Sequence, residues 1–84
     1  MFNLTRNRKV NSILMGQFLG ADYIVAKELV ESIKLIHVMA GSETNLFLTK
    51  MAVLKLSNGD LVKLKELTIA AKVDFRDVIM WASK

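Results

Sequence analysis

The chain has 84 residues, of which 52% are hydrophobic, and it contains no cysteine and no proline. This length suits one domain over residues 1–84, and the missing cysteines exclude disulfide-stapled scaffolds and zinc sites with thiolate ligands. The formal charge is +4, and residues 1–20 supply three of those charges through Arg6, Arg8 and Lys9 without any acidic residue. The sequence therefore predicts a basic first segment rather than a basic protein.

The N-terminal segment is a poor match to a secretory signal peptide. Asn11, Ser12 and Gln17 interrupt the short apolar run that follows the basic residues. The longest apolar stretch, residues 23–39, contains four charged residues, so no membrane span is expected. Small extracellular domains usually need disulfides, and we therefore expect a cytoplasmic protein.

The first helix is expected over Thr5–Leu19, where apolar side chains recur at spacings of three and four. Its inward stripe consists of Val10, Ile13, Leu14, Gln17 and Phe18. The basic residues then fall in its first turn, where the helix dipole disfavours cations. Their position indicates that they interact with something outside the helix, or that this turn is frayed.

A second helix is expected over Tyr23–Ala40, after a stop at Gly20 and a possible N-cap at Asp22 and before a stop at Gly41. Its predicted inward stripe is Val25, Leu29, Ile33, Ile36 and Ala40, widened by Ala26, Val30 and His37. In the last two turns, Leu35 and Val38 project on the charged side. That half of the helix should therefore be covered on both sides.

The third segment, Glu43–Leu56, is apolar almost all round and follows a possible N-cap at Ser42 or Thr44. Only Lys50 and Lys55 mark a solvent side, supported by Asn45 and Thr49. Such a helix belongs in the middle of a bundle or at an interface.

Asn58-Gly59 between apolar runs has two interpretations. It is a strong hairpin signal, and Leu54, Lys55 and Leu56 alternate as a strand would. The following apolar residues instead recur at helical spacing, which favours a helix–turn–helix with Gly59 as the left-handed residue. Helices are then expected over Leu61–Lys72, capped by Asp60, and from Phe75 towards Ser83, starting after Asp74. The predicted fold class is all-α, a small compact bundle of four to five short helices.

The sequence offers no catalytic constellation. His37 lies on an apolar stripe without a nearby Ser, Asp or Glu one turn away, so we expect a half-buried histidine with a hydrogen-bonded ring. Glu28 and Glu31 share the lysine-bearing face of the second helix, which indicates a solvated surface. We therefore expect a protein that is not an enzyme and has neither a metal site nor a cofactor.

Nucleic-acid binding is the alternative function. Residues 67–81 have the outline of a helix-turn-helix motif, but the turn lacks glycine and its second helix offers Arg76 beside Asp77. Arg6, Arg8 and Lys9 form a second candidate for contacts with phosphates. Three cations neutralise about three phosphates, which gives weak, salt-sensitive binding.

The preferred function is protein–protein interaction. The apolar fraction exceeds what a small domain readily buries, so part of it should cover a partner or a second copy in a homodimer. The predicted interface residues are Leu35, Val38, Met39, Met80 and Trp81.

Overall fold

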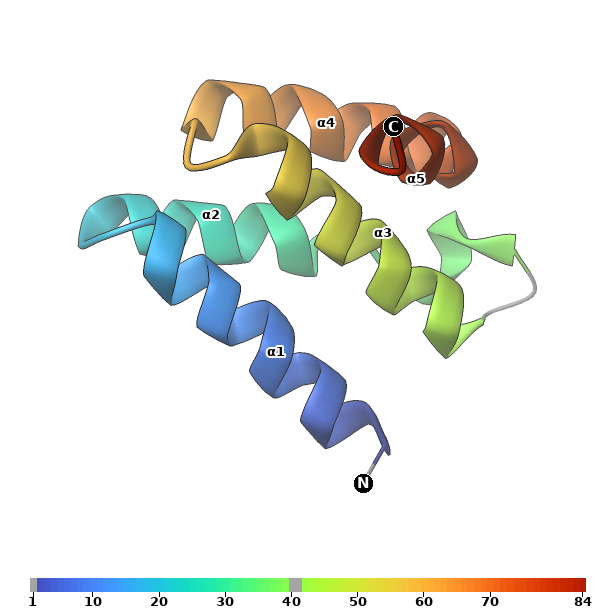
Figure 1. Ribbon diagram of the computed structural model, residues 1–84, viewed down its shortest axis with the longest axis horizontal. Helices are drawn as coiled ribbons and strands as arrows, with labels where there is room; N and C mark the ends of the chain where they lie inside the picture. Colours follow the sequence, from blue (N-terminus) through green and yellow to red (C-terminus); the bar gives the residue numbers. More distant parts are fainter. Residues whose placement is uncertain (1, 40–41) are drawn as a thin grey trace.

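The computed structural model describes residues 2–39 and 42–84, with side chains from Thr5 onward, and in these ranges every regular element is helical (Figure 1). The elements are α1 (Phe2–Gln17), α2 (Ala21–Glu31), the 3-10 turn η1 (Leu35–His37), α3 (Glu43–Ser57), α4 (Leu61–Val73) and α5 (Phe75–Ala82). The all-α prediction is confirmed, and helix–turn–helix replaces the hairpin alternative at Asn58-Gly59. The radius of gyration, 11.7 Å, agrees with the value of about 12 Å expected for a compact domain of this length.

Helix α3 crosses the centre of the molecule and packs against α1, α4 and α5 (Figure 1). Its buried residues are Thr49, Ala52, Val53, Leu54 and Ser57. The central position follows from its nearly continuous apolar surface, as predicted. Thr49 was expected near solvent, but it is fully buried. Its Oγ1 donates to the Asn45 carbonyl at 2.7 Å, and a hydroxyl satisfied within its own helix costs little to bury.

Three of the predicted N-caps start helices. The Ser42 hydroxyl accepts from the Asn45 N–H at 3.1 Å, Asp60 from the Lys63 N–H at 3.1 Å, and Asp74 from the Arg76 N–H at 3.0 Å. Each interaction satisfies one of the N–H groups that the first helical turn leaves without an internal partner. The expected cap at Asp22 is wrong: Gly20, with a φ of 59°, occupies the N-cap of α2, and Asp22 lies in the first turn.

Helix α1 begins and ends slightly earlier than predicted, at Phe2 and Gln17. Its predicted inward stripe is confirmed, with Val10, Leu14 and Phe18 buried and Ile13 partly buried. A hydrogen bond from the Tyr23 hydroxyl to Asn11 Oδ1, at 2.8 Å, ties the start of α2 to α1.

The second predicted helix is wrong in its C-terminal half, because α2 stops at Glu31. The Ser32 hydroxyl donates to the Leu29 carbonyl at 2.6 Å. In a continuing helix this carbonyl would accept a backbone hydrogen bond from the next turn. The backbone is then extended at Lys34, and the N–H of Lys34 donates to His37 Nδ1 at 2.8 Å, which closes the turn η1.

This break changes which side chains are buried and which are exposed. Val38 is 4% exposed and belongs to the core, whereas Ile36, predicted to be buried, is 87% exposed. Val25, also predicted inside, is exposed on α2. A continuous helix would have held Val38 on the charged side of α2, so the break allows Val38 to turn inward. Ala40 and Gly41, the predicted end and stop, lie outside the described residues.

The turn between α3 and α4 uses two left-handed residues rather than Gly59 alone. Asn58 has a φ of 45° and Gly59 a φ of 85°. A Cβ added at Gly59 would stand 3.4 Å from the carbonyl oxygen of Gln17. The start of α4 therefore lies at the same end of the molecule as the end of α1.

Candidate binding surfaces

The described residues include no group of three or more His, Asp or Glu side chains that would hold a metal ion. His37 is partly buried and has its Nδ1 engaged by the Lys34 N–H, as expected for a structural histidine. No helix in the described ranges is both long and apolar enough to cross a membrane.

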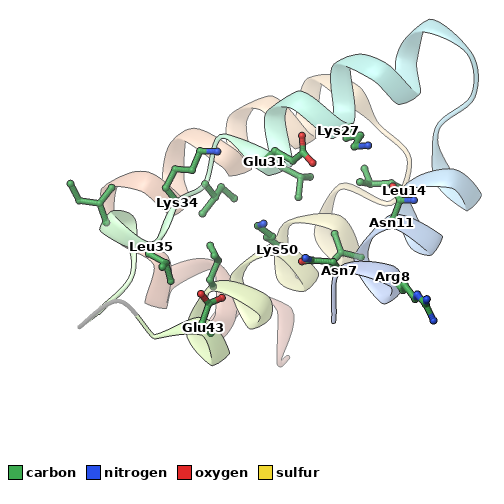
Figure 2. A pocket seen from close by; sticks show the side chains of 15 residues that line it. Asn7, Arg8, Asn11, Leu14, Lys27, Glu31, Lys34, Leu35, Glu43 and Lys50 are labelled. Carbon is green, nitrogen blue, oxygen red and sulfur yellow. The ribbon is translucent and has the colours of Figure 1, made fainter. Parts of the chain in front are cut away.

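An open groove of about 880 Å³ lies between α1, α2, η1 and α3 (Figure 2). Its floor is apolar and comes from three helices: Val10 and Leu14 of α1, Val30 of α2, Ile33 just beyond α2, and Leu46 of α3. Most of these residues also belong to the buried core, so the floor is fixed by the packing of the bundle.

The rim of this groove is charged and predominantly basic. It consists of Arg8, Lys27, Lys34 and Lys50 together with Glu31 and Glu43, which gives a local charge of +2. Figure 2 shows Lys50 and Glu43 from α3 turned towards the open space, whereas Arg8 points away from it at the edge. The groove therefore combines an apolar floor with the ammonium group of Lys50, which is turned towards its open space.

Lys50 was expected to mark the solvent side of α3, but the groove encloses about half of it. Within residues 5–39 and 42–84, its ammonium donates no hydrogen bond and has no carboxylate oxygen within 4.0 Å. Burial lowers the pKa of Lys50 below its ordinary value of 10.5, and the charge of Lys34 acts in the same direction. Glu31 and Glu43 oppose the shift, but from too far away to form an ion pair with Lys50.

Helix α4 has a second notable surface, on the side opposite its buried residues. Val62, Ile69 and Val73 are 71%, 57% and 83% exposed. At 3.6 residues per turn these three side chains lie within about 40° of one another, and we name them the α4 outer face. This face was not predicted from the sequence, because α4 already has an inward stripe of apolar residues: Leu61, Leu64, Leu67 and Ala71. The spacing of 62, 69 and 73 is the signal that reveals it.

A smaller groove of about 540 Å³ lies between α1, α3 and α5. It is lined mainly by apolar side chains, including Ile13, Met51 and Ile79. Gln17 also lines it, and its buried Oε1 has no hydrogen-bond partner among the described residues. The groove has one cation, Lys55, whose ammonium donates to the Ala82 carbonyl.

Four of the five predicted interface residues are exposed, two in or just after η1 and two on α5. Leu35 lines the larger groove and Met39 is exposed beyond η1. Met80 and Trp81 are exposed on α5. The prediction for Val38 is wrong, because this side chain is buried and a partner therefore has no access to it.

The predicted nucleic-acid residues are also divided among different contacts. Arg6 donates from Nη1 to Thr44 Oγ1 at 3.1 Å, and its guanidinium lies 5.3 Å from the centre of the Phe47 ring. Arg8 belongs to the groove edge, and Lys9 is exposed on α1. Nucleic-acid binding by this set stays a prediction that no contact in the structure favours.

Arg76, the fourth predicted nucleic-acid residue, is held by Asp74. Two of its nitrogens donate to the Asp74 carboxylate, each at 3.0 Å. These bonds lower the pKa of Asp74 and raise that of Arg76. A phosphate would therefore compete with a bidentate carboxylate for this guanidinium.

No protein-family model matches the chain, and neither the curated proteins nor the solved structures include a significant match to it.

Proposed function

We propose that the protein is a non-enzymatic interaction module that self-associates through the α4 outer face. The observation that carries the proposal is the alignment of Val62, Ile69 and Val73 on one exposed side of a helix whose other side is already buried. Removing a Val or Ile side chain from water is worth about 1.5–3 kcal/mol. An uncovered stripe of three such side chains is therefore a source of association energy.

The charges on α4 favour a second copy of the same chain as the partner. Glu66 lies between Val62 and Ile69 on the outer face, and Lys65 is its neighbour. In an antiparallel pair of α4 helices with Val62 against Ile69 of the second copy, Glu66 stands against Lys65 of that copy. The two-fold axis repeats both contacts, as expected for an isologous dimer.

Neighbouring residues extend this apolar end of the molecule. Leu19 and Ile24 are exposed at the α1–α2 corner. The contact of Gly59 with the end of α1 places that corner beside the start of α4, and α2 packs against α4. A dimer built on α4 thus has further apolar surface available at its edge.

Light scattering on a size-exclusion column, at two protein concentrations in moderate salt, tests the proposal. We expect twice the chain mass of 9.4 kDa for the wild type, and 9.4 kDa for Ile69→Glu and Val73→Glu. The matched control is Ile36→Glu, because Ile36 is even more exposed than Ile69 but lies at the groove, and this variant should keep the dimer mass. Circular dichroism should show unchanged helicity in all variants.

A wild-type mass of 9.4 kDa at both concentrations would overturn self-association. A dimer that persists in Ile69→Glu but is lost in Ile36→Glu would move the interface to the groove and exclude the α4 outer face.

A further inference from the structure

The larger groove has the dimensions and chemistry of a small-molecule site and lies on elements other than α4. Its volume of about 880 Å³ falls within the range of about 300–1,000 Å³ typical of ligand pockets. Such sites combine an apolar lining with a few polar groups that orient the ligand. Ligand binding in this groove is therefore independent of the self-association proposed for α4.

Lys50 is the polar group that determines the charge of the ligand. Its ammonium stands above an apolar floor, half enclosed, without a hydrogen bond or an ion pair to the described residues. A cation held in this way is costly unless an anion pairs with it. A negatively charged group placed on Lys50 would remove that cost.

The neighbouring carboxylates limit how much negative charge the groove accepts. Glu31 and Glu43 both line it and are close enough to Lys50 to influence its charge. They would repel a doubly charged phosphate or an acidic helix that brings several carboxylates together. A single negative charge, shared between Lys50 and Lys34, suits the rim best.

The floor of the groove and its η1 end determine the chemistry of the part of the ligand that extends away from Lys50. Ile33 lies on the floor, and Leu35 and Ile36 continue the apolar lining to the η1 end. Ile36 is 87% exposed there, with no described side chain covering it. Ile33 is itself fully buried, so a flexible hydrocarbon chain that starts near Lys50 would cover Leu35 and Ile36.

We infer that the groove binds an aliphatic monocarboxylate, with its carboxylate on Lys50 and its hydrocarbon chain along the exposed side chains of Leu35 and Ile36. A polyanion would be repelled by Glu31 and Glu43, and an uncharged lipid would leave the ammonium of Lys50 without an anionic partner.

Methyl NMR titration of the full chain with sodium decanoate, below its micelle-forming concentration, tests this inference. We expect saturable shifts at the methyl groups of Val10, Val30 and Ile33. Octanoate should bind up to about 15-fold more weakly, because two buried methylenes are worth about 0.8 kcal/mol each. Acetate, which lacks the chain, should give no saturable shift.

Two substitutions separate the carboxylate contact from a general apolar effect. Lys50→Met keeps the length of the side chain without its charge and should weaken decanoate binding at least tenfold, with little change in decanol binding. Lys9→Met removes an exposed lysine of α1 outside the groove and should leave both unchanged. Val73→Glu should bind decanoate as the wild type does, whatever its oligomeric state.

Three results would overturn the inference: no groove shifts with decanoate, equal decanoate affinity in Lys50→Met and wild type, or binding of decanol as tight as that of decanoate. Shifts of the same methyl groups with an acidic amphipathic peptide but not with decanoate would make the groove a peptide-docking site.

Discussion

Helices α3 and α4 look alike in sequence but have opposite surroundings. Both carry apolar residues on more than one side, so neither shows a single clean stripe. Helix α3 packs against α1, α4 and α5, which cover most of its surface, and Val53 and Leu54 are fully buried. Helix α4 lies at the edge of the bundle, and its outer face stays exposed (Figure 1).

The difference shows that apolar composition cannot by itself separate a core helix from an interface helix. What decides is the number of neighbouring helices, which depends on where the turns direct the chain. The left-handed Asn58-Gly59 turn places α4 against one side of α3, and the single residue Asp74 returns α5 to the same side. None of the described elements covers the α4 outer face.

The largest expected effect contrasts one residue from each helix. In the Val73→Glu background, which is expected to be monomeric, Leu54→Ala should lower the free energy of unfolding by about 3 kcal/mol, because it leaves a cavity in the core. Ile69→Ala should change it by no more than about 0.5 kcal/mol, since the side chain is already in water. Urea denaturation followed by circular dichroism measures both values. Similar losses in the two variants would mean that the α4 outer face is covered within the monomer.

The fold was predictable where helix spacing, caps and turns agreed. Ser42, Asp60 and Asp74 are helix-start residues with short side-chain acceptors, and each starts the helix expected of it. The break after Glu31 was not predictable from periodicity, because Ser32 and Ile33 fit a helix locally. The burial of Val38 favours the break, and that gain depends on residues far away in sequence.

The candidate surfaces were harder to predict for the same reason. Arg8 and Leu35 were assigned to rival functions, yet both line the larger groove. The position of Lys50 depends on how α1 and α2 flank α3, which no local pattern encodes. The α4 outer face was present in the spacing of its residues, but core and interface stripes are chemically identical there.

A medium effect is expected from removing the cap that starts α4. Asp60→Ala should lower the free energy of unfolding by about 1 kcal/mol, because the Lys63 N–H loses its acceptor. Asp60→Asn keeps an acceptor at the same place and should be nearly neutral. Hydrogen exchange should speed up in the first turn of α4, while the amides of α3 near Val53 stay protected. An equal increase of the exchange rates in α3 would mean that the two helices open together, so that the core helix and the edge helix would not differ in local stability.

The smallest effect concerns Lys50, a half-buried lysine of α3 that lines the larger groove. Lys50→Met should raise the free energy of unfolding by up to about 1 kcal/mol, because it removes a half-buried ammonium without breaking an ion pair within the described residues. Lys9→Met, which removes an exposed lysine of α1 outside both proposed surfaces, is the matched control and should change stability little.

The pH dependence of that gain tests its cause. Burial lowers the pKa of Lys50 in the folded state below 10.5, so the unfolded chain binds this proton more tightly. Wild-type stability therefore rises, relative to Lys50→Met, as the pH increases through the lowered pKa towards 10.5. The advantage of Lys50→Met should be largest near neutral pH and shrink in that alkaline window. A constant difference at all pH values would show that shape rather than charge accounts for the gain, and a loss of stability in Lys50→Met would show that the ammonium is stabilising in the free protein.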